Sequence, residues 1–146
     1  METPIRERGL RQNEFESQTA ATSLTSSTFS GHCLQGIVAG CAVFEVWQHN
    51  NLLRSADSAA CLAQFSVDIG DRRVFAGVHY PTDNVASWIL AMNLIPHIFK
   101  EPEPILKFAK FAITERSHVY KELQKRATAT VALTKPIAAL DAALSI

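Results

Sequence analysis

The sequence predicts an all-α fold, and three observations lead to that prediction. Apolar residues recur at helical spacing in several separate stretches of the chain. No stretch of useful length alternates apolar and polar residues as a half-buried strand would, and no internal repeat is present. The chain has 146 residues, of which 47% are hydrophobic and 19% charged, which suits one folded domain. We therefore expect a single helical bundle.

The first helix is expected over residues 31–48, where apolar side chains follow helical spacing and Ser30 precedes them as an N-cap. A second, shorter helix is expected over residues 56–66. It should be followed by a turn, because Gly70 and Asp71 are residue types that favour turns. These two helices would supply the first half of the bundle.

A third helix is expected over residues 81–99, because Pro81 suits a first helical turn and Asp83 favours the positive end of the helix dipole. From Ile105 to Leu123 the apolar residues form one face and the lysines lie largely outside it, which predicts a single amphipathic helix. A short helix after Pro136 would complete the chain.

Charge and composition exclude several classes of protein. The formal net charge is zero, so no overall field would draw the chain to nucleic acid, and we expect no nucleic-acid partner. No run reaches the roughly 18 uncharged apolar residues of a membrane span, and the first residues are too charged for a secretory signal. We therefore expect no transmembrane span and a cytoplasmic protein. No metal ligands are expected from the three cysteines, which should be free, buried thiols: Cys33, Cys41 and Cys61.

Two of the expected helix starts carry side chains that are capable of catalysis or of binding a ligand. The first is S-G-H at residues 30–32, and the second has His79 and Asp83 on either side of a proline. A helix start offers unpaired backbone N–H groups and a partial positive charge, which suit an anion. Arg73, six residues before His79, could add a guanidinium that matches phosphate oxygens two at a time. Together these residues predict an oxyanion pocket.

The pattern S-G-H, followed some forty residues later by R-x5-H-x3-D, resembles two signature motifs of a known superfamily, that of type 2 phosphatidic acid phosphatases and vanadium haloperoxidases. The resemblance covers about residues 26–100 and implies the helical bundle of the acid phosphatase and vanadium haloperoxidase type. It divides the chain into an N-terminal segment (1–28), a phosphatase/haloperoxidase-like helical domain (29–130) and a tail or short helix (131–146). The superfamily's other motif, K-x6-R-P, is absent. The resemblance also implies more helix before residue 26 than this chain has, so we expect an N-terminally truncated chain.

The resemblance also implies a role for each residue of the two motifs. His79 matches the nucleophile that forms a phosphohistidine in the phosphatases, or the vanadate ligand in the haloperoxidases. Asp83 matches the carboxylate that orients this imidazole, and His32 matches the general acid that protonates the leaving group. The groups that bind the equatorial oxygens of phosphate or vanadate match Arg73, Ser30 and Gly31.

Three functions remain open from the sequence. The leading one is a metal-independent phosphoric monoester hydrolase without a cofactor, acting on a small phosphate ester. The second is a vanadium-dependent haloperoxidase with vanadate as its cofactor, held by His79; the short chain favours the phosphatase. The third is an inactive fragment or oxyanion-binding relative, which the absent motif supports and which could self-associate into a homo-oligomer. A purely structural alternative pairs Arg73 with Asp83 while His79 fills a gap in the core.

Overall fold

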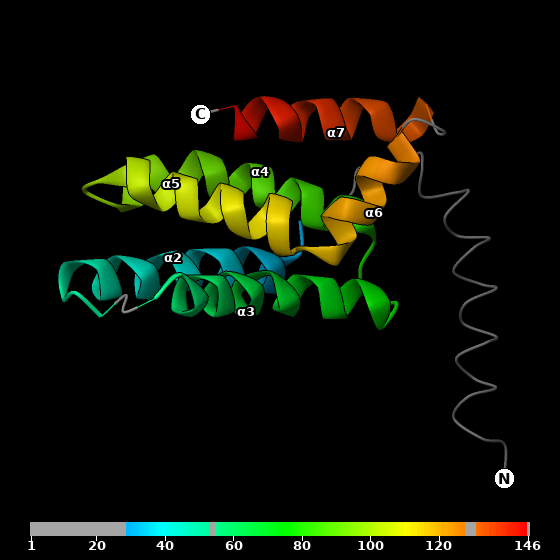
Figure 1. Ribbon diagram of the computed structural model, residues 1–146. Coiled ribbons are helices and arrows are strands. Elements are labelled where there is room, and N and C mark those ends of the chain that lie inside the picture. The colour runs from blue at the N-terminus through cyan, green and yellow to red at the C-terminus, as the bar shows by residue number, and fades with distance from the viewer. Residues whose placement is uncertain (1–28, 53–54, 128–130, 146) are drawn as a thin grey trace, which may run out of the picture.

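The structure is a computed structural model that describes residues 29–52, 55–127 and 131–145. All of its elements in that part of the chain are helical, which confirms the expected all-α fold. Helices α2 and α3 form one layer, α4 and α5 lie over them, and α7 packs along α4 on the opposite side (Figure 1). None of the described helices is both long and apolar enough to cross a membrane. The elements are α2 (Gly31–His49), α3 (Ala56–Phe75), α4 (Pro81–Ile98), α5 (Pro102–Phe111), the π-helical turn η1 (Ala112–Arg116), α6 (His118–Ala127) and α7 (Val131–Leu144).

The core is centred on α4, which contacts α2, α5 and α7. Trp88 of α4 is fully buried, and its indole meets the Tyr120 ring edge to face at a centroid distance of 6.3 Å. The Phe44 and Phe108 rings stack at 4.4 Å, which ties α2 to α5. Because α4 is held on several sides, the residues at its first turn have fixed positions relative to α2. The other large side chains that are fully buried include Ile37, Ile95, Ile105, Ile113 and Leu140.

Two expected helices are confirmed almost to the residue. The first begins at Gly31, and the Ser30 hydroxyl accepts a hydrogen bond of 3.3 Å from the Cys33 backbone N–H, as an N-cap does. The third begins at Pro81, whose missing N–H leaves no bond unmade at the first helical position. Both predictions succeeded because the signals are local to the helix start.

The expected turn at Gly70 and Asp71 is wrong, because both residues lie inside α3. Gly70 is there because α3 and α2 approach closely: a Cβ at this position would lie 2.7 Å from the Cys33 sulfur. The Asp71 side chain is 1% exposed and accepts hydrogen bonds from the start of α6. Residue types that usually mark a turn are here required by contacts with other helices.

The expected single helix from Ile105 to Leu123 is divided at Ser117, whose backbone is extended. The Ser117 hydroxyl accepts a hydrogen bond from the Tyr120 N–H at 3.0 Å and donates to Asp71 at 2.9 Å. Ser117 thus caps a new helix while it is anchored to α3. Apolar side chains on both sides of the break are buried, among them Ile105 and Phe108 of α5 and Val119 and Leu123 of α6.

The last helix begins earlier than expected. We expected a start after Pro136, but α7 begins at Val131 and contains the proline. Its buried side chains are Ile137, Leu140 and Leu144, which follow helical spacing and pack in the core. Contacts with α4 and α6 hold this helix in place.

Large apolar side chains are also exposed on the layer formed by α2 and α3. Phe65 and Phe75 of α3 are 67% and 68% exposed, and Val46 of α2 is 54% exposed. Such side chains are compatible with a second copy of the chain as a partner, which stays a prediction.

The three cysteines should differ sharply in reactivity, which corrects the expectation that all are buried. Burial raises the pKa of the Cys41 thiol to about 12, and burial, followed by the nearby Asp71 carboxylate, raises that of Cys33 further. Cys61 is exposed. We therefore expect one thiol to react with an aromatic disulfide reagent in the native protein and three after denaturation, with Cys61→Ser removing the fast one. Rapid native reaction of two or more thiols would contradict this burial.

Candidate functional site

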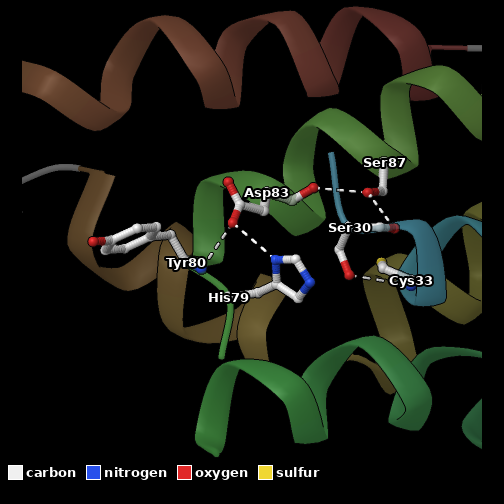
Figure 2. Close-up of polar contacts among 6 residues, drawn as sticks. All are labelled: Ser30, Cys33, His79, Tyr80, Asp83 and Ser87. Atoms are coloured by element: carbon white, nitrogen blue, oxygen red, sulfur yellow. Dashed lines mark hydrogen bonds and ion pairs between the residues drawn. The ribbon is translucent and has the colours of Figure 1, made fainter. Parts of the chain in front are cut away.

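The structure brings the two chemistry-bearing helix starts together. The backbone N–H of Ser30, at the start of α2, donates to the Asp83 carbonyl of α4 at 3.4 Å. The Ser87 hydroxyl of α4 lies 3.0 Å from the Ser30 carbonyl oxygen. Figure 2 shows His79, Asp83 and Ser30 around this junction. Residues more than fifty positions apart in the sequence therefore form one site.

A histidine and an aspartate form the centre of the site. His79 Nδ1 lies 3.1 Å from Asp83 Oδ2, and the same oxygen accepts a hydrogen bond of 3.0 Å from the Tyr80 backbone N–H. The Asp83 side chain is 6% exposed and that of His79 is 22% exposed. Because the carboxylate accepts at Nδ1, the neutral ring carries its proton there and leaves Nε2 with a free lone pair.

Local structure explains why these two side chains meet. Tyr80 is the N-cap residue of α4 and Asp83 stands three residues later, where a carboxylate reaches back to the N-cap N–H. His79 directly precedes the N-cap, so its ring lies beside that carboxylate. Figure 2 shows the second ring nitrogen of His79 pointing away from Asp83. The imidazole is therefore oriented and still open to a ligand.

Arg73 is linked to His79 through the backbone. Its carbonyl oxygen accepts hydrogen bonds from the N–H groups of Val78 at 3.0 Å and His79 at 3.3 Å, which close the connection between α3 and α4. Gly77 in this connection has a φ of +70°, a conformation that glycine adopts without steric cost. The Arg73 Nε atom is buried without a hydrogen-bond partner among the described residues, so this N–H donor is not engaged within that part of the chain.

The S-G-H residues differ in exposure. Ser30 is fully buried, and its hydroxyl oxygen is engaged in capping α2. Nothing lies within 4 Å of the place where a Cβ of Gly31 would stand, so packing does not require a glycine and the space beside its backbone is open. His32 is exposed on the first turn of α2, and the described residues give it no hydrogen-bond partner. Its role as the general acid stays a prediction.

The sequence-predicted residues thus fall into two groups. In the first group, the Ser30 N–H donates to the Asp83 carbonyl, and the Asp83 side chain pairs with His79. Arg73 belongs to this group because its carbonyl accepts a hydrogen bond from the His79 N–H. Gly31 and His32 follow Ser30 at the open start of α2. The described residues show Asp83 paired with His79 and not with Arg73, in contrast to the purely structural alternative.

One residue of this junction was not singled out in the sequence analysis. Ser87 is fully buried one turn after Asp83, and its hydroxyl lies 2.8 Å from the Asp83 carbonyl oxygen as well as near that of Ser30. The spacing of four residues shows that Ser87 and Asp83 share a face of α4. No sequence signal indicates that this face meets the start of α2.

A separate pocket of about 600 Å³ opens between the end of α3, the start of α4, and helices α6 and α7. Its lining is mainly apolar and includes Val74, Tyr80 and Leu123. In Figure 2 the Tyr80 side chain extends away from the His79 ring. The pocket therefore lies beside the site and is distinct from the open side of the His79 ring. Within the described ranges, no cluster of three or more acidic, histidine or cysteine side chains could hold a metal ion.

The fold and the site together define a helical protein with an oriented histidine beside a helix start suited to an oxyanion. A comparison with models of known families finds a match: the model of the PAP2 superfamily matches residues 4–103. The chain therefore belongs to the PAP2 superfamily. No curated protein and no solved structure shows significant similarity to it.

Proposed function

We propose that the protein hydrolyses phosphoric monoesters through a phosphohistidine intermediate on His79. The observation that carries this proposal is the pairing of His79 Nδ1 with Asp83 Oδ2 at 3.1 Å, which leaves Nε2 as the free nucleophile. Membership of the PAP2 superfamily supports phosphatase-type hydrolysis. The class of substrate is a small phosphate ester.

In the first step, His79 Nε2 attacks phosphorus and forms the N–P bond while the P–O bond to the leaving alkoxide breaks. His32 gives its proton to that alkoxide. In the second step, water attacks phosphorus, the N–P bond breaks, and inorganic phosphate leaves. His32, now neutral, accepts the proton from that water, and the site returns to its starting state.

The negative charge of the phosphoryl group needs stabilisation in both steps. The unpaired Nε donor of Arg73 and the backbone N–H groups at the start of α2 are suited to the equatorial oxygens. The open space beside Gly31 would allow an oxygen to approach the backbone. The Ser30 hydroxyl can donate its proton to an oxygen while it accepts from Cys33.

A vanadium-dependent haloperoxidase is the second candidate, because vanadate has the charge and shape of phosphate. The same residues would hold it, with His79 Nε2 as the ligand and Arg73 beside it. Bound vanadate supplies the activation of peroxide for halide oxidation. The third candidate is a relative that binds an oxyanion without turnover, which the missing K-x6-R-P motif supports.

Hydrolysis of p-nitrophenyl phosphate by the purified protein tests the proposal, with orthovanadate as competitor. We expect turnover without added cofactor and competitive inhibition by vanadate. Halide oxidation that appears only with added vanadate and peroxide, without ester hydrolysis, would instead establish the haloperoxidase. Vanadate binding without either activity would identify the inactive relative.

A further inference from the structure

The Ser87 side chain lies between the start of α2 and the first turn of α4. Its hydroxyl oxygen lies 2.8 Å from the carbonyl oxygen of Asp83 and 3.0 Å from that of Ser30 (Figure 2). The Ser30 N–H donates to the same Asp83 carbonyl at 3.4 Å. We call the two hydroxyl contacts the Ser87 bridge. The bridge connects the residue that caps α2 with the residue that orients His79.

The position of the bridge matters because helix ends are held less firmly than helix interiors. The first N–H groups of a helix have no partner within the helix, so their placement depends on contacts outside it. In α2 these are the same groups that would face an oxyanion. A displacement of about 1 Å between such donors and a nucleophile can cost on the order of 10²-fold in rate.

We infer that Ser87 is a positioning residue that holds the start of α2 against the His79–Asp83 pair. The hydroxyl proton of Ser87 is directed at main-chain oxygens, so it is not offered to a substrate. The consequence for oxyanion binding rests on the proposed function, whereas the holding of α2 does not. Loss of the hydroxyl should therefore loosen the Ser30 backbone first and weaken ligand binding as a result.

The chain contains a matched control for this inference. Ser66 of α3 is 1% exposed, and its hydroxyl donates to the Leu62 carbonyl four residues earlier at 2.7 Å. Ser87 has the same burial and the same bond to a carbonyl four residues earlier, but it also reaches a second helix. Alanine at position 66 removes a buried hydroxyl of the same kind without removing a bridge between two helices.

The test compares wild type with Ser87→Ala and Ser66→Ala. Three properties are measured: amide hydrogen exchange at Ser30 and Cys33, the Kd of orthovanadate, and kcat/KM for p-nitrophenyl phosphate. We expect Ser87→Ala to accelerate exchange at these two amides, and to weaken vanadate binding and lower kcat/KM by about 10- to 100-fold. Ser66→Ala should leave all three near the wild-type values. Unchanged exchange and affinity in Ser87→Ala, or equal losses in both variants, would overturn the inference.

A second variant guards against misfolding of Ser87→Ala. Ser87→Thr keeps a hydroxyl on the same side-chain atom, so both contacts of the Ser87 bridge, including the one to the Ser30 carbonyl, can form and the folded variant should retain protection of the Ser30 amide. Loss of that protection in Ser87→Thr would overturn the inference. If wild type neither binds vanadate nor hydrolyses the ester, the proposed function fails, and the exchange data alone decide whether Ser87 holds α2.

Discussion

Replacing His79 with alanine is expected to lower the hydrolysis of phosphate monoesters by at least about 10³-fold. The variant loses the imidazole that the Asp83 carboxylate orients, and with it the Nε2 nucleophile, so the covalent route through an N–P bond is closed. The fold should survive, because His79 precedes α4 and its side chain is partly exposed. Asp83 also keeps its hydrogen bond from the Tyr80 N–H.

The measurement is kcat/KM with p-nitrophenyl phosphate, together with trapping of a phosphoenzyme from a radiolabelled substrate. His97→Ala is the matched control, because His97 is an exposed histidine in the last turn of the same helix, α4. The His97→Ala variant should hydrolyse p-nitrophenyl phosphate and form the radiolabelled phosphoenzyme as wild type does. Wild-type turnover or labelling in His79→Ala would exclude His79 as the nucleophile.

Replacing Asp71 with alanine is expected to reduce the free energy of unfolding by about 3 kcal/mol, because several buried donors lose their acceptor together. One Asp71 oxygen accepts from the His118 N–H at 2.7 Å and from the Val119 N–H at 3.2 Å. The Ser117 hydroxyl lies within 3.0 Å of both carboxylate oxygens. Without these bonds the start of α6 loses its attachment to α3.

Urea denaturation followed by circular dichroism gives this free energy. Asp68→Ala serves as the control, because Asp68 lies on the same helix with a side chain that is 31% exposed and has partners within α3 itself. Its loss should cost no more than about 0.5 kcal/mol. Equal midpoints for the two variants would show that the Asp71 contacts with α6 contribute little.

The same carboxylate should also make stability depend on pH. Burial raises the pKa of Asp71 above its ordinary value of 3.8, although hydrogen bonds from Ser117, Val119 and His118 lower it. The native state therefore binds this proton more tightly than the unfolded chain, and stability from this group falls as pH rises from 3.8 through the raised pKa. Relative to Asp71→Asn, wild type should gain stability as the pH is lowered from about 7 to about 4.

Much of the site was predictable because its signals are local. Pro81 and Asp83 mark the first turn of α4, and helix geometry places a carboxylate at that position near the residues just before the helix. The pairing of His79 with Asp83 was implied by the resemblance to the R-x5-H-x3-D motif, and in the structure the two side chains lie 3.1 Å apart. Ser30 as the N-cap of α2 was also predictable from a local signal. In each case the partners lie within one turn of each other.

Other features depend on partners far away in the sequence. Asp71 and Ser117 are 46 residues apart and form a hydrogen bond. Asp71 lies where we expected a turn but α3 continues, and Ser117 lies where the expected single helix breaks before α6. Ser87 and Ser30 are 57 residues apart. Apolar spacing shows which face of a helix is buried, but it does not show which other helix covers that face.

The amino-acid sequence by itself determined the all-α class and the starts of α2 and α4, because apolar spacing and capping signals within one turn govern them. Only the tertiary structure decided that the Ser30 cap meets the first turns of α4, with Ser87 between them. That meeting depends on how α2, α3, α4 and α5 pack around a common core. The packing is set by the combined burial of many side chains, so no single motif encodes it.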